Sequence, residues 1–442
     1  MSGILPLLTC LTFEINNTSL KHLGLIIQAM LAMTGRVTML GISRWAGKGG
    51  SYRTIQRFFY SPQNWPTLMW VFFRIHCFCP EEKYAIAGDE VVTTKSGKQT
   101  YGMDWFFSGL AQRPVKGLAF FALSLVGLEQ RQSYPLRIEQ VICPVSENKA
   151  TPQNAALQEK RGRGRPKGSK NKDKTQVNLS SELLHIRGML SALLSTMGES
   201  IPLEYLLLDG KFGHNNAVQM TRHLGLHLVS KLRYDSALYL PYTGSNSRRK
   251  YGDKINPRKM PQQFLCQTTT EENWRLDYYQ VQVLHKEFAQ PLNLVILLKT
   301  HLKTQQQGHV ILFSSDLELN YNQLIELYSL RFQIEFDFRD AKQFWGLEDF
   351  MNISQTAVTN AVNLAFFMVN LSRRLLQDFR RDQHPQFSIL DLKAYSRAFK
   401  YVDEVIKLLP QKPEPILISR IKNQLVNLGA IHSVSITDIS PG

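Results

Sequence analysis

The sequence has few of the features that mark secreted, membrane-bound or zinc-binding proteins. Its five cysteines are an odd number without a disulfide framework, and Cys77 and Cys79 have no second pair with which to bind zinc. The apolar runs near residues 24–33 and 118–128 are too short to span a bilayer. The N-terminus lacks the basic segment of a signal peptide. We therefore expect a protein of the reducing cytoplasm with no membrane partner.

Acidic residues are also scarce, above all near the N-terminus. Residues 1–80 contain seven Lys or Arg but a single acid, Glu14, and the 442 residues carry a net charge of +16. This excess favours a polyanionic partner, nucleic acid before membrane, although some basic proteins merely have basic surfaces. The length predicts two or three domains.

The stretch "ISRWAGKGGSYRTIQRFF" (42–59) predicts a helix, a glycine-rich turn and a second helix that begins at Ser51. The apolar residues of the second helix would face the core and leave Arg53 and Arg57 outward. A DNA-recognition helix is built in this way, and so is a helical cap with a solvated basic face. We expect residues 1–80 to form a helical DNA-binding region.

The pattern changes to strands at about residue 84. "YAIAGDEVVTT", "QTYGMDWFFSGL" and "KGLAFFALSLVGL" predict three antiparallel strands, and residues 240–308 are again rich in strand patterns. Helical patterns dominate the end of the chain, over about 320–345, 355–380 and 389–409.

Residues 146–178 are a break in composition, which we interpret as a basic linker. Its segment 160–174 holds eight basic residues and one acid, and its Gly and Pro exclude a packed element. Arg163 and Arg165 belong to an Arg-Gly-Arg-Pro run that resembles an AT-hook, which lies in a narrow minor groove. A solvated flexible linker is the alternative.

Two acids close apolar strand patterns. Asp89 ends "YAIAGD" and Asp209 ends "YLLLD". Side chains at such positions project from a sheet edge into solvent or a cleft, although a single acid there is more often a turn or cap residue.

A third candidate acid lies in "YSLRFQIEFDFRDAKQFWG" (328–346). If this stretch is one helix at about 100° per residue, Tyr328, Arg331, Glu335 and Lys342 fall within about 60° of one another, and Asp337 points to roughly the opposite side. Glu335 is then the acid flanked by a phenol, a guanidinium and an ammonium group. The alternative is a surface stripe joined by salt bridges.

The spacing Tyr-x2-Arg-x3-Glu-x6-Lys of these residues resembles the signature of the YREK group of DDE transposases from bacterial insertion sequences. The strands that end in Asp89 and Asp209 are similar to the two aspartate strands of that family, and the resemblance covers about residues 80–380. Phe332 departs from the pattern, because the group often has Trp after the signature arginine.

The resemblance implies an α/β fold with an RNase H-like mixed-sheet catalytic core. The core would comprise residues 81–239, which include the linker, and residues 309–380. Residues 240–308 would be a β-strand-rich insertion, and the N-terminal region 1–80 and the C-terminal region 381–442 would be helical.

The resemblance also implies a cut-and-paste DNA transposase. Asp89, Asp209 and Glu335 would be its catalytic residues and would hold two Mg²⁺ ions, for which Mn²⁺ substitutes. Tyr328, Arg331 and Lys342 would bind phosphates of the transposon end.

The partners implied are terminal inverted repeats, target DNA and a second copy of the chain in a synaptic complex, in a bacterial cytoplasm and associated with the nucleoid. Two alternatives remain open. A catalytically inactive DNA-binding relative or repressor of transposition would need no carboxylates, and a junction-resolving nuclease on the same core would not explain the Tyr-Arg-Lys face.

Overall fold

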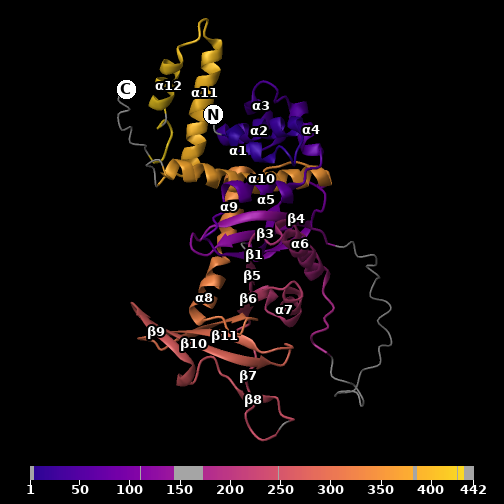
Figure 1. Ribbon diagram of the computed structural model, residues 1–442, viewed down its shortest axis with the longest axis vertical. Helices are drawn as coiled ribbons and strands as arrows, with labels where there is room; N and C mark the ends of the chain where they lie inside the picture. The colour runs from indigo at the N-terminus through magenta and orange to yellow at the C-terminus, as the bar shows by residue number, and fades with distance from the viewer. Residues whose placement is uncertain are drawn as a thin grey trace, which may run out of the picture. The chain divides into compact units, whose positions relative to one another are not determined.

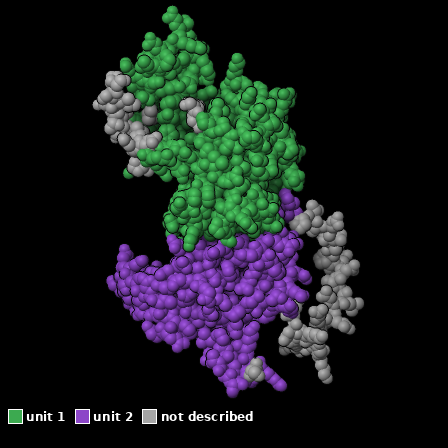
Figure 2. Space-filling view, viewed as in Figure 1, with its two compact units in different colours: residues 1–140, 188–203, 329–442 green, residues 141–187, 204–328 purple. Residues whose placement is uncertain are grey.

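The chain folds into two compact units, which Figure 2 shows in separate colours. The computed structural model describes residues 4–109, 111–143, 173–246, 248–381, 386–425 and 427–432. Unit 1 comprises residues 1–140, 188–203 and 329–442, and unit 2 comprises residues 141–187 and 204–328.

The N-terminal part of unit 1 is helical. Its elements are α1 (Ile4–Leu8), a 3-10 turn (Thr9–Leu11), α2 (Asn17–Ala32), α3 (Met39–Ala46), α4 (Tyr52–Tyr60) and α5 (Trp65–His76). Asn16, Thr38 and Ser51 each accept a backbone N–H at the start of a helix. The predicted start at Ser51 is thus confirmed. Gly47 and Gly49, between α3 and α4, have φ of +71° and +88°, a conformation that favours glycine.

Unit 1 also contains an antiparallel sheet centred on β3. The strands are β1 (Tyr84–Thr94), β2 (Asp104–Ser108), β3 (Arg113–Gly127) and β4 (Ser133–Val141). Both β1 and β2 pair antiparallel with β3, as predicted, and β4 pairs with β3 as well. In this register Asp89 lies opposite Ala122.

Four helices complete unit 1. They are α9 (Gln333–Trp345), α10 (Gln355–Arg381), α11 (Ile389–Leu408) and α12 (Pro415–Gln424). Helix α10 packs against α4, α5 and α9, and its apolar face is buried core (Figure 1). Trp65 Nε1 donates to Asn360 Oδ1 at 2.8 Å, and Asn360 Nδ2 donates to the carbonyls of Phe59 at 2.7 Å and Ser61 at 2.8 Å. These bonds join α10 to the N-terminal helices and satisfy polar groups that are hidden from water.

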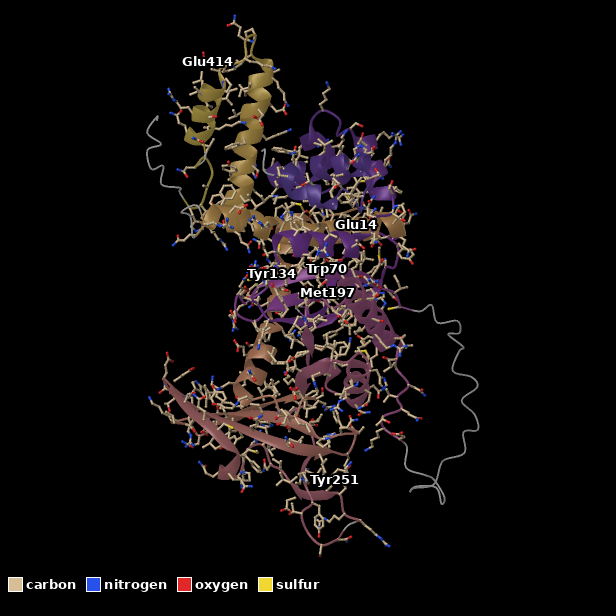
Figure 3. All side chains as sticks on the ribbon, in the orientation of Figure 1. Glu14, Trp70, Tyr134, Met197, Tyr251 and Glu414 are labelled. Carbon is tan, nitrogen blue, oxygen red and sulfur yellow. The ribbon has the colours of Figure 1, made fainter. Side chains whose placement is uncertain are left out.

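An aromatic cluster fills the space between α5 and the sheet. Trp70 and Tyr134 lie in the interior of unit 1 (Figure 3). The ring of Phe73 is 6.0 Å from that of Trp70, 5.0 Å from that of Tyr134 and 5.7 Å from that of Tyr84. Because Tyr84 opens β1 and Tyr134 belongs to β4, α5 covers one face of this sheet.

Unit 2 is built on a mixed sheet. Its strands are β5 (Leu203–Leu207), β6 (His227–Leu232), β7 (Leu238–Pro241), β8 (Tyr251–Lys254), β9 (Leu265–Glu271), β10 (Trp274–His285), β11 (Leu292–His301) and β12 (Gln307–Ser314). Strand β5 pairs parallel with β6, and β6, β12, β11 and β10 follow in antiparallel order. The predicted richness of residues 240–308 in strands is confirmed.

The remaining elements are three helices and two short turns. They are α6 (Ser181–Met197), α7 (Asn215–Arg222), α8 (Tyr321–Leu330) and 3-10 turns at Gly210–Phe212 and Gln262–Phe264. Within the described residues, no helix is both long enough and apolar enough to cross a membrane.

Candidate active site

Asp89 is the first residue of β1 that reaches solvent. The five residues before it, Tyr84–Gly88, are buried. This burial is typical of an apolar strand that is covered by helices and paired with a neighbouring strand. The Asp89 side chain is 22% exposed, and its Oδ1 accepts the backbone N–H of Glu90 at 2.8 Å. The strand therefore presents a carboxylate at the point where burial ends.

Arg331 joins Asp89 to Glu335. Its Nη1 donates to Asp89 Oδ2 at 2.8 Å, and its Nη2 donates to Glu335 Oε1 at 3.3 Å. The Arg331 side chain is only 7% exposed, whereas that of Glu335 is 50% exposed. One buried guanidinium thus holds two carboxylates that are far apart in sequence, and the group opens to solvent at Glu335. We call Asp89, Arg331 and Glu335 the open triad.

The single helix expected over 320–345 is wrong. Helix α8 ends at Leu330 and α9 begins at Gln333, and Arg331 lies in the interruption. There the backbone makes tighter bonds, from Ile334 N to Arg331 O at 3.2 Å and from Glu335 N to Phe332 O at 3.1 Å. Tyr328 therefore does not share one helical register with Glu335.

Lys342 lies further along the face of α9 that carries Glu335. Its Nζ donates to the carbonyl of Val92 at 2.9 Å and pairs with Glu348 Oε1 at 3.0 Å. Val92 follows Asp89 by three residues on β1, so Lys342 and the open triad line the same strand. Arg331 and Lys342 thus both contact β1, at Asp89 and at Val92.

The other two acids of this stretch are buried. Asp337 is fully buried, pairs with Arg373 Nη1 at 2.6 Å and accepts the hydroxyls of Ser124 at 3.0 Å and Ser133 at 2.6 Å. Burial raises the pKa of Asp337, and Arg373 and the two hydroxyls oppose that shift. Asp337 is therefore on a different face from Glu335, as expected, and is surrounded by protein.

Asp340 shares the same arginine. Its Oδ2 is 3.8 Å from Arg373 Nη2, and its Oδ1 accepts Arg339 Nη2 at 2.9 Å. The Asp340 side chain is 7% exposed. We call Asp337, Arg373 and Asp340 the buried triad, which sequence reasoning missed because Arg373 belongs to another helix.

Asp209 belongs to unit 2 and lies two residues after the end of β5. It occupies the N-cap position of the 3-10 turn Gly210–Phe212, and its backbone carbonyl accepts the hydroxyl of Ser230 at 2.7 Å. Its side-chain Oδ1 is buried and has no hydrogen-bond partner among the described residues. A buried carboxylate oxygen without a donor is costly, which suits a position that takes a cation.

The remaining predicted residues are dispersed. Tyr328 lies in the last turn of α8 and is half-buried, and Arg53 and Arg57 are exposed on α4. Arg163 and Arg165 lie outside the described residues. In the described parts of the chain, no group of three or more His, Cys, Asp or Glu side chains is placed to hold a metal ion.

A strand carboxylate and a helix carboxylate in a mixed α/β fold, with helices at both ends of the chain, agree with the RNase H-like class of nucleases. The sequence profile of the DDE superfamily endonucleases matches residues 6–283, so the chain belongs to this family. The match includes Asp89 and Asp209 and ends before Glu335. A search of curated proteins gives no match. Endonucleases of this superfamily act on DNA and generally use divalent metal ions.

Proposed function

We propose that this protein is a DNA transposase that cleaves the ends of a mobile element and joins them to target DNA. The observation that carries the proposal is the open triad, in which Asp89 and Glu335 meet on Arg331 although Arg331 and Asp89 are 242 residues apart in sequence. Bringing two carboxylates close together costs free energy. A half-exposed acid in such a charged cluster is typical of a functional site.

The carboxylates fit the metal ions that the family uses. Asp89 and Glu335 share the Arg331 guanidinium, and Asp209 Oδ1 is a buried oxygen for which the described residues supply no donor. Carboxylate oxygens are the ligands that Mg²⁺ prefers. We propose that these three residues hold two Mg²⁺ ions, for which Mn²⁺ substitutes. Bound there, the ions would activate a water or a 3′-hydroxyl and stabilise the leaving oxygen.

Arg331 has a second role in this proposal. Its planar guanidinium can bind a phosphate through two parallel hydrogen bonds, as it now binds two carboxylates. DNA at the site would therefore draw Arg331 from the acids to a phosphate of the element end. Lys342, beside the same strand, and Tyr328 would bind neighbouring phosphates.

The order of steps follows from the resemblance to the YREK group. Each end is nicked, its 3′-hydroxyl attacks the opposite strand to give a hairpin, and the freed end attacks target DNA. One kind of site must process both terminal inverted repeats, which requires a homodimer in a synaptic complex.

The C-terminal helices offer a surface for this dimer. Tyr401, Val405 and Leu408 recur at helical spacing on α11 and are 54%, 58% and 84% exposed, and Ile416 on the adjacent α12 is 73% exposed (Figure 1). Exposed apolar side chains at helical spacing are typical of an interaction surface, and two symmetry-related copies of this surface would bury one another. The apolar face of α10, by contrast, is buried core.

The basic elements would bind the DNA at positions other than the site of cleavage. Arg53 and Arg57 are exposed on α4 while Ile55 and Phe58 of the same helix are buried. This is the two-faced construction of a recognition helix. Arg163 and Arg165 would add contacts in the minor groove.

The test is a cleavage assay on a labelled duplex that carries the element end, read on a denaturing gel. We expect cuts at the end with Mg²⁺ or Mn²⁺, and binding with little cleavage with Ca²⁺ because its looser coordination positions the phosphate poorly. Binding to the end without any metal-dependent cut would instead identify a DNA-binding relative without catalysis.

A further inference from the structure

A cavity of about 470 Å³ lies in unit 1 beside α9. It is walled by α9, by α10, by the turn between β3 and β4, and by the start of α11. Residues of α9 that line it include Phe336, Arg339 and Asp340. The cavity therefore borders a different face of α9 from the one that carries Glu335 and Lys342.

Four arginines line this cavity: Arg131, Arg339, Arg373 and Arg380. Two carboxylates accompany them, because Asp340 lines the cavity and Asp337 pairs with Arg373 from behind. The four guanidinium groups and the two carboxylates therefore carry a net charge of +2.

The arginines are held in position by different elements. Arg373 is only 10% exposed and is fixed by Asp337. Arg131 Nη2 donates to Ser329 Oγ at 3.3 Å, and Arg380 Nε donates to the carbonyl of Phe387 at 3.1 Å. A set of guanidinium groups around a cavity suits phosphate, because each planar fork matches two phosphate oxygens.

The uncharged lining suits a nucleotide better than an isolated anion. Phe336 is 43% exposed and carries the guanidinium of Arg339 over its ring at 4.9 Å. Gln130, Gln132 and Gln333 add amide groups that can donate and accept hydrogen bonds. Aromatic rings beside guanidinium groups are the usual surroundings of a nucleic-acid strand.

We propose that this cavity binds the phosphate backbone of a second DNA segment, distinct from the one that is cut. Because the cavity and Glu335 border different faces of α9, we assign the phosphates in the cavity and beside Glu335 to different segments. The identity of this segment as target DNA rests on the proposed function, but the binding of phosphate does not.

The first experiment measures binding without cleavage. Fluorescence anisotropy in EDTA would follow a labelled oligonucleotide of random sequence, with pyrophosphate and poly-glutamate as competitors. We expect Arg339→Ala with Arg380→Ala to weaken binding about tenfold and to lower the salt slope by about two. Arg381→Ala is the matched control, because Arg381 follows Arg380 on α10, is 71% exposed and does not line the cavity.

Each outcome of this experiment decides the proposal. Unchanged affinity in the double variant would overturn it, and so would displacement by poly-glutamate but not by pyrophosphate, which would identify an acidic peptide as the ligand. Displacement by pyrophosphate that is lost in the double variant would support it, even if the wild type cuts no DNA.

The second experiment identifies the segment. Strand transfer from pre-cut ends into a plasmid should fall about tenfold in the double variant, while cleavage of the ends stays within about twofold of the wild type. Equal loss of both activities would place the element end in the cavity and overturn the assignment to target DNA.

Discussion

Two acid–arginine–acid triads lie on different faces of α9 and differ chiefly in their exposure. The open triad pairs Arg331 with Asp89 and with Glu335, whose side chain is half exposed. The buried triad pairs Arg373 with Asp337 and Asp340, which are almost hidden from solvent. The same kind of ion pairing therefore has different consequences in the two triads. Where one acid stays accessible the charges can change partners, and where none does the charges fasten helices and strands together.

The largest expected effect comes from removing a charge of the open triad. Asp89→Asn and Glu335→Gln should each lower cleavage of the element end on the order of a thousandfold, because each would remove a charge that we propose binds metal while conserving shape. Asp209→Asn should do the same if the third carboxylate joins this site. The assay is the cleavage gel, and circular dichroism checks the fold.

The control for this comparison is an exposed acid away from both triads. Glu14→Gln suits, because Glu14 is exposed in the turn before α2. It should cut DNA at the rate of the wild type. If this variant lost as much cleavage activity as Glu335→Gln, the open triad would have no distinct role in cleavage.

The second effect concerns stability. Asp337→Asn should lower the free energy of unfolding by about 3–5 kcal/mol, because Arg373 would keep a buried charge without its closest partner. Cleavage per folded molecule should persist. Urea denaturation measures the change. The combination of Asp337→Leu with Arg373→Met should cost less than the two single changes together, and additive losses would show that the pair is not coupled.

The third effect tests whether Arg331 changes partners. Arg331→Ala should lower cleavage of the end by about tenfold or more, because a phosphate contact is lost. The same change should tighten binding of Mn²⁺ to the DNA-free protein by about tenfold, because a competing cation leaves Asp89 and Glu335. Calorimetric titration with Mn²⁺ measures this, and weaker binding would show that Arg331 orders the acids for the metal instead.

The smallest effect extends the comparison to another fully buried acid, Asp391. Burial opposes its ionisation, but hydrogen bonds from His432, Ser388 and the backbone of Ile431 together outweigh burial and lower its pKa. A carboxyl group whose pKa is lower in the folded protein stabilises the fold at pH values above its unfolded pKa of about 3.9. This contribution to the free energy of unfolding is lost as the pH falls through the folded pKa.

We therefore expect Asp391→Asn to lower the free energy of unfolding by about 1–2 kcal/mol at pH 7 and by less at pH 3. Urea denaturation at the two pH values measures the difference. A loss of the same size at both values would assign the effect to helix capping alone, since Asp391 also belongs to the capping box of α11.

The sequence predicted the local features whose causes are local. The apolar run before Asp89, the cap at Ser51 and the shared face of Glu335 and Lys342 all follow from periodicity and from residue type. The interruption at Arg331 did not, because the stretch contains neither Gly nor Pro and the break depends on what the two helices pack against.

Features that depend on distant segments could not be predicted. No residue near Asp337 in the sequence indicates that Arg373 pairs with it. The cavity arginines Arg131 and Arg380 likewise come from different segments, the turn between β3 and β4 and helix α10. Fold-level pairing of this kind is set by packing, and a single sequence carries no direct trace of it. The resemblance to a family placed Asp89 and Glu335 in one site, whereas their spacing alone would not have done so.

The bond between Trp65 and Asn360 limits how evolution can exchange parts of this protein. The N-terminal helices are fastened to α10 by a buried side-chain pair, and their last helix also covers the sheet that carries Asp89. A transplanted N-terminal region must therefore bring a residue that satisfies Asn360, or Asn360 must change with it, so the N-terminal helices and the sheet that carries Asp89 are exchanged together.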